Sequence, residues 1–179
     1  TSYGGFNNVI IEKNGEYKIS PVNLSASSLR TFIDRLVLVY TGKTRRATAI
    51  AKKKVENMGS KEQSYHSIQS MVSEAYGTLL SNDFDNFGYM LNESWQIKKE
   101  LSDSISNSDI DDIYNLGLKN GAIGGKLLGA GGGGFILFLT KDGEKENFIK
   151  KMGNFISVPF ELSLKGTEVI YNGDPIHNE

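Results

Sequence analysis

The sequence contains no cysteine, and this absence excludes several kinds of chemistry. Disulfide frameworks, thiolate zinc sites and thiol nucleophiles all require cysteine. A chain without disulfides suits a reducing compartment, so we expect a cytoplasmic protein. The sequence also lacks a long apolar run, because the longest, residues 135–139, is far shorter than the roughly 20 residues that span a bilayer. We therefore expect no association with a membrane.

Neither sign of charge is in excess. The chain has 20 lysine and arginine residues against 21 aspartate and glutamate residues, a formal net charge of −1. Nucleic-acid binding needs a basic excess that neutralises phosphates, so we expect no nucleic-acid partner. Any phosphate chemistry must be confined to a local site. With 179 residues, 39% of them hydrophobic, the chain is large enough for a globular domain with its own core.

The order of apolar and polar segments predicts the secondary structure. Asn14-Gly15 suits a hairpin turn between residues 6–12 and 16–20, and a dense apolar run predicts a strand over residues 32–40, after a serine-rich stretch. Helical patterns cover 44–58, 62–80, 84–101, 109–120 and 144–152, and further strands are expected at 135–139, 155–162 and 168–171. This order predicts an α+β fold with helices packed on one face of a mainly antiparallel sheet.

The most informative segment is a glycine-rich run that begins after a predicted helix. It reads Gly124-Gly125-Lys126-Leu127-Leu128-Gly129-Ala130-Gly131-Gly132-Gly133-Gly134. Glycines tolerate positive φ, so consecutive N–H groups can converge on one anion. Apolar residues flank the run on both sides, whereas flexible linkers are polar and long. We therefore expect a phosphate-binding loop rather than a linker, with Gly129, Ala130, Gly131, Gly132, Gly133, Gly134 and Lys126 supporting the phosphate.

Two better-known phosphate motifs do not fit this run. Gly129, Gly131 and Gly134 formally satisfy G-x-G-x-x-G, but a Rossmann turn follows a strand and opens a helix, whereas this loop is expected to follow a helix and open a strand. A P-loop would need Ser or Thr after Gly125-Lys126, where Leu127 stands. Gly42-Lys43-Thr44 is a second partial match, but Val37 stands where the first glycine of that motif should be.

A second cluster of polar residues follows the predicted strand at residues 32–40. Thr41, Gly42, Lys43, Thr44 and Arg45 place cations and hydroxyls at the start of a predicted helix, where free N–H groups favour an anion. We expect them to bind a substrate or nucleotide phosphate, although a solvated helix start is the alternative. Lys126 is either a phosphate ligand or a solvated lysine, and Gly4 and Gly5 are either a tight corner near the substrate or the entry to the first strand.

No metal site is expected from the side chains. His66 and His177 have no suitably spaced partner. Asp109, Asp111 and Asp112 precede a helical pattern, so capping, by Ser108 or Asp109, explains them better than metal binding. Trp95 is expected in the core. The residues alone identify no catalytic side chain.

The glycine run resembles the third conserved motif of the GHMP kinases, the superfamily of galactokinase, homoserine kinase, mevalonate kinase and phosphomevalonate kinase. Five segments resemble the D-glycero-D-manno-heptose 7-phosphate kinase branch of that superfamily in particular: residues 3–7, 40–45, 95–99, 110–114 and 121–126. The resemblance implies a ferredoxin-like carboxyl-terminal kinase domain over residues 31–179. It also implies that residues 1–30 are a hairpin remnant of the amino-terminal kinase domain.

The resemblance implies an activity as well: ATP- and Mg²⁺-dependent phosphorylation of a heptose 7-phosphate at its anomeric hydroxyl. In similar kinases a Pro-x-x-x-Gly-Leu-Gly-Ser-Ser type loop cradles ATP, and this loop does not occur in the 179 residues. We therefore expect a chain cut from a longer one, which lacks its amino-terminal kinase domain and is inactive alone. The alternatives are a fucokinase-like or other GHMP sugar kinase, or a non-catalytic metabolite-binding domain. Homodimer formation is left open.

Overall fold

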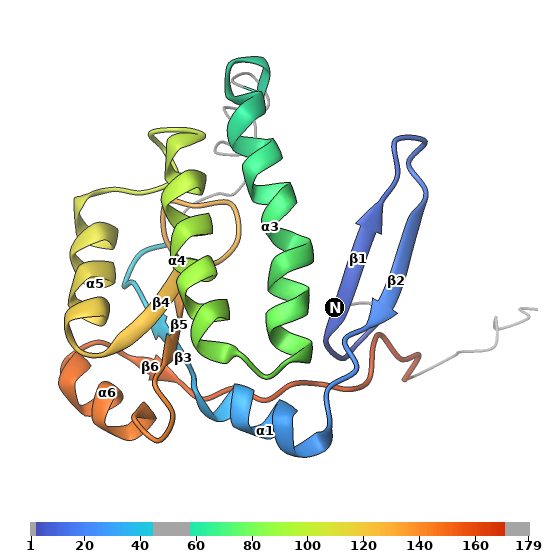
Figure 1. The fold of residues 1–179 in the computed structure, drawn as a ribbon. Coiled ribbons are helices and arrows are strands. Elements are labelled where there is room, and N and C mark those ends of the chain that lie inside the picture. Colours follow the sequence, from blue (N-terminus) through green and yellow to red (C-terminus); the bar gives the residue numbers. More distant parts are fainter. Residues whose placement is uncertain (1–2, 45–57, 171–179) are drawn as a thin grey trace, which may run out of the picture. The chain divides into compact units, whose positions relative to one another are not determined.

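The computed structural model describes residues 3–44 and 58–170 and divides the chain into two compact units (Figure 1). One unit combines Thr1–Val22 with Glu161–Glu179, and the other is Asn23–Phe160. This division by contacts differs from the predicted boundary after residue 30. The assignment of residues 1–30 to a preceding kinase domain stays a prediction, because contacts within this chain do not show to which domain of a longer protein a segment belongs. The helix predicted for residues 44–58 falls almost wholly outside the described residues.

The first unit contains the predicted hairpin. Strands β1, Asn7–Ile11, and β2, Tyr17–Pro21, pair antiparallel with Ile11 opposite Tyr17. The turn forms as its sequence predicts, because Gly15 has a φ of +86° and the Asn14 side chain accepts a 3.0 Å hydrogen bond from the N–H of Glu16. A late strand over 168–171 was predicted wrongly, since residues 168–170 form no regular element.

The second unit is built on a four-stranded sheet whose pairs are all antiparallel, which confirms the predicted α+β class. The strand order is β4-β5-β3-β6 (Figure 1). The strands are β3, Leu36–Tyr40; β4, Ala122–Leu127; β5, Phe135–Thr140; and β6, Ser157–Val158. Of the strand predicted over 155–162, only the two residues of β6 pair with β3.

The helices lie close to their predicted bounds. They are α3, Glu62–Leu80, preceded by a 3₁₀ turn at Met58–Lys61; α4, Phe84–Glu100; α5, Ser108–Lys119; and α6, Lys145–Met152. Among the described residues, no helix is long and apolar enough to cross a membrane.

Aromatic side chains bind the helices to the sheet. The Phe138 ring in β5 lies 5.8 Å from Tyr114 in α5 and 5.4 Å from Phe148 in α6, measured between centroids. Trp95 in α4 is fully buried 6.0 Å from Tyr114, as the prediction of a core residue required. Helix α4 also lies against the edge strand β4. The core therefore anchors both ends of the loop that joins β4 to β5.

The predicted strand over residues 32–40 is really two elements. Residues Ala26–Asp34 form helix α1, and β3 begins only at Leu36. The serine-rich stretch before it starts this helix, because the Ser25 hydroxyl accepts a 3.1 Å hydrogen bond from the N–H of Ser28. Phe32 is buried against Phe84 of α4. A capped helix with one buried aromatic was thus mistaken for an apolar strand.

The cap of α5 was also predicted wrongly. Asn107, rather than Ser108 or Asp109, is the N-cap, and its side chain accepts a 3.1 Å hydrogen bond from the N–H of Ile110. Asp109 and Asp111 lie in the first turn, where the helix dipole favours negative charge. Their predicted role as helix-start residues therefore holds, although neither is the cap.

Candidate functional site

The glycine-rich loop lies between two strands of one sheet. Strand β4, Ala122–Leu127, includes residues 124–127, which were expected as part of the loop, so the loop proper covers residues 128–134 and follows a strand rather than a helix. It still opens a strand, β5, which is antiparallel to β4. A Rossmann turn would open a helix, so this motif remains excluded. Each end of the loop is fixed by a buried strand.

The backbone of the loop has a conformation that only glycine adopts easily. The φ angles are +74° at Gly129, +118° at Gly131, +76° at Gly132, +154° at Gly133 and +104° at Gly134. An L side chain is strained at such angles. Ordering five flexible glycines is entropically unfavourable, so the geometry indicates a requirement for close backbone approach.

Some N–H groups of the loop have no acceptor within the part of the chain that the structure describes. These are the N–H groups of Gly129, Ala130, Gly131 and Gly133. Free N–H groups on a positive-φ backbone are the donors of an anion nest. The loop therefore fits a phosphate group by donor chemistry as well as by conformation.

Hydrogen bonds tie the loop to the segment after β3. The N–H of Gly134 donates to the Lys43 carbonyl at 2.8 Å, and the Thr41 hydroxyl donates to the Gly134 carbonyl at 2.9 Å. The Thr41 N–H donates to the same Gly134 carbonyl, also at 2.9 Å. The structure thus brings together two segments that the sequence predicts separately, the glycine loop and residues 41–44.

The side chains of residues 41–44 are not all free to bind one phosphate, because Lys43 has a carboxylate partner. The Lys43 ammonium forms an ion pair with the carboxylate of Asp109 in the first turn of α5, and both side chains are about half exposed. Lys43 is therefore held by a carboxylate beside the loop. Gly42 has a φ of +73° and Thr44 is exposed. Arg45 lies outside the described residues, so its predicted contact with a substrate stays a prediction.

A lysine that the sequence analysis did not select holds the other side of the loop. Lys98, near the end of α4, donates hydrogen bonds from Nζ to the carbonyls of Leu127 at 3.1 Å and Gly129 at 2.9 Å. An ammonium group that binds carbonyl oxygens orients these peptides and fixes their N–H groups on the opposite side. The sequence signal for this role of Lys98 was a basic last turn of the predicted helix. Basic residues at that position ordinarily indicate only a favourable interaction with the helix dipole.

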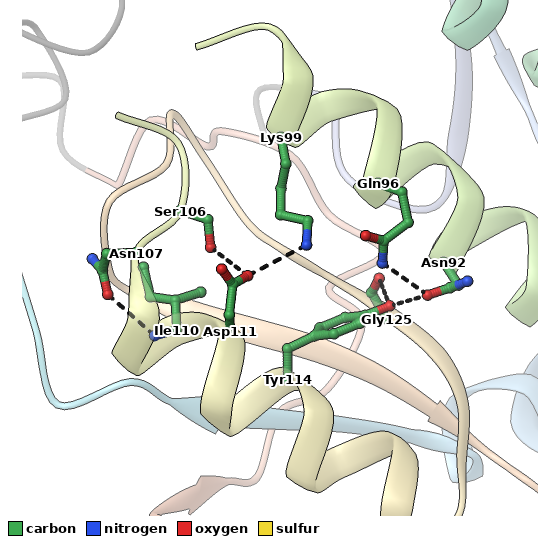
Figure 2. Close-up of polar contacts among 9 residues, drawn as sticks. All are labelled: Asn92, Gln96, Lys99, Ser106, Asn107, Ile110, Asp111, Tyr114 and Gly125. Atoms are coloured by element: carbon green, nitrogen blue, oxygen red, sulfur yellow. Dashed lines mark hydrogen bonds and ion pairs between the residues drawn. The ribbon is translucent and has the colours of Figure 1, made fainter. Parts of the chain in front are cut away.

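The segment that precedes α5 also holds the loop by a hydrogen bond. The carbonyl of Ile105 accepts a 2.8 Å hydrogen bond from the N–H of Gly132. Asp111, one turn into α5, accepts from the Ser106 hydroxyl at 2.9 Å and pairs with Lys99 of α4 at 3.4 Å (Figure 2). These contacts fix the segment that carries Ile105, so the loop rests on an ordered support.

Tyr114 connects the same helices to β4. Its hydroxyl lies 2.7 Å from the Asn92 side-chain oxygen and 3.1 Å from the Gly125 carbonyl (Figure 2). Because a hydroxyl has one hydrogen, the two oxygens share this donor. Burial raises the pKa of Tyr114 well above its ordinary value of 10.0, so the hydroxyl stays protonated and acts as a structural donor.

Lys126 lies in strand β4, before the loop of residues 128–134. Its side chain lies in a pocket between α3 and α4 that Met71 and Met90 also line. Burial lowers the pKa of Lys126 below its ordinary value of 10.5. Its predicted role at the phosphate loop stays a prediction, and its position in this pocket is a separate feature.

Gly4 and Gly5 belong to the other compact unit. The N–H of Gly5 donates to the Ser163 carbonyl at 2.6 Å, and both glycines line a hollow of about 430 Å³ with Lys165. Their predicted role in substrate binding stays a prediction. Over the described residues, no group of three or more His, Asp or Glu side chains is arranged to hold a metal ion.

The family of GHMP kinases, C terminal, matches residues 75–157, which include α4, α5, β4, the glycine loop and β5. The chain contains a GHMP kinase C-terminal domain. This finding confirms the resemblance on which the sequence prediction of the family rested. It places the loop of residues 128–134 within the matched segment of this domain.

Individual proteins are similar over more of the chain. It is 31% identical to D-glycero-alpha-D-manno-heptose 7-phosphate kinase of Campylobacter jejuni, over 84% of this chain and 45% of that protein. It is 28% identical to the bifunctional fucokinase/GDP-fucose pyrophosphorylase of Arabidopsis thaliana, over 75% of this chain and 13% of that protein. The L. major mevalonate kinase structure shares the fold, with a TM-score of 0.69 and 18% identity over 93% of this chain and 51% of that chain.

The GHMP kinase C-terminal domain therefore accounts for part of a larger protein in each of these comparisons. The chain spans 45% of the length of the Campylobacter protein.

Proposed function

We propose that this chain is the carboxyl-terminal part of an ATP-dependent sugar kinase that phosphorylates a heptose 7-phosphate, at its anomeric hydroxyl. The observation that carries the proposal is the loop of residues 128–134, with five positive-φ glycines and four N–H groups that have no acceptor among the described residues. Phosphoryl transfer depends mainly on positioning and charge stabilisation, and rigid N–H donors supply both.

The chain's own residues would act by holding this loop in place. Thr41 and the Lys43 carbonyl fix Gly134, the Ile105 carbonyl fixes Gly132, and Lys98 fixes the carbonyl of Gly129. The remaining N–H groups would then meet phosphate oxygens without rearrangement. When bound, ATP supplies the transferred group and Mg²⁺ offsets its negative charge.

The choice of a heptose 7-phosphate rests on similarity. The Campylobacter relative carries that name, and its similarity covers 84% of this chain, compared with 75% for the Arabidopsis fucokinase protein. A sugar phosphate also has an anion of its own, for which the basic segment around Lys43 is a candidate partner. A fucokinase-like sugar kinase is the second candidate, because the Arabidopsis relative matches most of the same residues.

The proposal is tested with the full-length parent protein. It is incubated with Mg²⁺-ATP and a panel of D-glycero-D-manno-heptose 7-phosphate, L-fucose and mevalonate, and products are read by ³¹P NMR. We expect a new anomeric phosphate on the heptose 7-phosphate only. Phosphorylation of fucose instead would favour the second candidate, a fucokinase-like sugar kinase. ATP binding with no turnover of any acceptor would favour a metabolite-binding domain.

The 179-residue chain alone is expected to be inactive in the same assay, because it has no Pro-x-x-x-Gly-Leu-Gly-Ser-Ser type loop. Phosphorylation of the heptose 7-phosphate by this chain alone would contradict the proposed division of the active site.

A further inference from the structure

A pocket between α3 and α4 contains a lysine that the proposed kinase chemistry does not use. The pocket has a volume of about 170 Å³ and is lined by apolar side chains of both helices, with Lys126 from β4. Met71 and Ala75 come from α3, and Met90 and Leu91 come from α4. All these residues belong to one compact unit, so the pocket does not depend on how the two units are placed.

The Lys126 amine has no hydrogen-bond or ion-pair partner among the residues that the structure describes. No acidic residue occurs among the pocket-lining residues in that part of the chain. The only other polar side chain there, Ser94, already donates to the Leu91 carbonyl at 2.9 Å. A partly buried cation without a counter-charge is unfavourable, and such groups concentrate at binding sites.

The chemistry of the walls limits what the pocket can bind. A single amine neutralises a single negative charge, whereas a phosphate carries more charge and more acceptor oxygens than one donor group can satisfy. The other side chains that line the pocket are mainly apolar, so they would contact the carbon atoms of a ligand. The volume is below the roughly 300–1,000 Å³ of pockets that enclose drug-sized ligands, so the ligand must be small.

We propose that this pocket binds a small monocarboxylate with a short apolar tail, whose carboxylate pairs with the Lys126 amine while the tail lies between Met71 and Met90. The site is separate from the glycine loop, and the proposal does not depend on the identity of the phosphorylated sugar. Burial also lowers the pKa of Lys126, so a bound carboxylate would favour the protonated amine and binding would take up protons near that pKa.

The probe is hexanoate, with hexanamide as the uncharged molecule of matched shape. The 179-residue chain is labelled with ¹³C at its methionine methyl groups and titrated in NMR experiments. Met71 and Met90 report on the pocket, and Met152, buried in the core on α6, serves as an internal control. We expect saturable shifts of the Met71 and Met90 signals with hexanoate, and affinity about tenfold lower for hexanamide.

Three variants make the test specific. Lys126→Met removes the charge and is expected to lower hexanoate affinity about tenfold, and Ala75→Leu fills the pocket and should abolish the shifts. Lys141→Met, at an exposed position, removes an equal charge elsewhere and should leave binding unchanged. An unchanged Met152 signal establishes that each variant is folded.

Several results would overturn the proposal. One is equal affinity for hexanoate in the wild type and Lys126→Met, which would show that the amine does not bind the carboxylate. Another is the absence of Met71 and Met90 shifts at high hexanoate concentration, as expected if other residues of the chain already fill the pocket. Preferential binding of inorganic phosphate at these two methionines would also contradict the assignment to a monocarboxylate.

Discussion

The glycines of the loop are required for two separable reasons. At Gly129 only the φ of +74° matters, because an added Cβ would meet nothing within 4 Å. At Gly133 the φ is +154° and an added Cβ would also lie 2.7 Å from the Lys43 carbonyl. At Gly131 it would lie 2.8 Å from the Ile105 backbone. Gly133 and Gly131 thus let the loop approach the two carbonyls that hold it.

Gly133→Ala tests this requirement directly. Backbone strain and a clash with a carbonyl should together lower the free energy of unfolding by about 2 kcal/mol. Gly129→Ala, the matched control, has strain without a clash and should lose only about 1 kcal/mol. Urea unfolding followed by the fluorescence of Trp95, the single tryptophan, measures both. Equal losses would show that close approach to Lys43 has no energetic role.

The amine of Lys126 should reduce stability in the absence of a ligand. Lys126→Met removes a partly buried charge and should raise the free energy of unfolding by about 1 kcal/mol near neutral pH. The folded pKa of Lys126 lies below the ordinary 10.5, so the unfolded state binds more protons between these two values. The unfavourable contribution is therefore complete below the folded pKa and fades as the pH rises towards 10.5.

Urea unfolding at about pH 7 and about pH 10 measures this effect, with Lys141→Met as the exposed control. We expect the gain of Lys126→Met to shrink between the two pH values, while the control changes little at either. A gain that grows with pH would contradict the burial of an unpaired amine.

At the scale of elements, the sequence predicted those segments whose pattern is long and periodic. Helix α3 extends over the predicted 62–80 because its apolar stripe recurs at helical spacing from Ile68 to Leu79. Helix α1 was missed because it is short, and its Phe32 and Ile33 continue directly into the apolar residues of β3. Strand β4 was missed because two of its residues, Gly124 and Gly125, have little intrinsic strand propensity.

Packing against α4 gives β4 its stability and explains its glycines. An added Cβ at Gly124 would lie 1.9 Å from the Gly88 carbonyl of α4, so helix and strand approach at the level of their backbones. Such a contact depends on an element more than 30 residues away in the sequence. Local sequence patterns do not contain this information, so β4 was read as loop.

Gly124→Ala should therefore be among the most destabilising single-methyl additions in this unit. A backbone carbonyl cannot move aside as a side chain can, so we expect a loss of about 3 kcal/mol in the free energy of unfolding. Gly77→Ala is the matched control, because Gly77 lies inside α3 with nothing within 4 Å of an added Cβ. It should gain about 0.5–1 kcal/mol through helix propensity. A neutral Gly124→Ala would contradict the backbone contact between α4 and β4.

At the scale of the molecule, the sequence predicted the family and the two segments that meet at the loop, but not which side chains hold them. Thr41 and Gly134 were both selected, and they are hydrogen-bonded. Lys98 was missed because its role depends on where the end of α4 lies relative to the loop. The place of Lys126 in the pocket between α3 and α4 was missed because strand β4, which carries this residue, was not predicted.

The second unit has a core of its own, formed by Trp95, Tyr114, Phe138 and Phe148. We therefore expect it to fold without the rest of the parent protein and, under the proposed function, to restore activity in trans. Neither the 179-residue chain nor the remaining amino-terminal part of the parent should phosphorylate the heptose 7-phosphate alone, whereas their mixture should regain part of the activity. Coupled assays of ADP release from the separate parts and their mixture measure this.

The Gly133→Ala chain provides the decisive control for this mixture. If its circular dichroism spectrum and Trp95 fluorescence show that it is folded, it should bind the amino-terminal part but restore much less activity, because the strain falls on the loop that is proposed to support phosphate. Equal restoration by the wild-type and Gly133→Ala chains would mean that the loop contributes structure rather than phosphate support. Activity of the amino-terminal part alone would show that this domain is dispensable for catalysis.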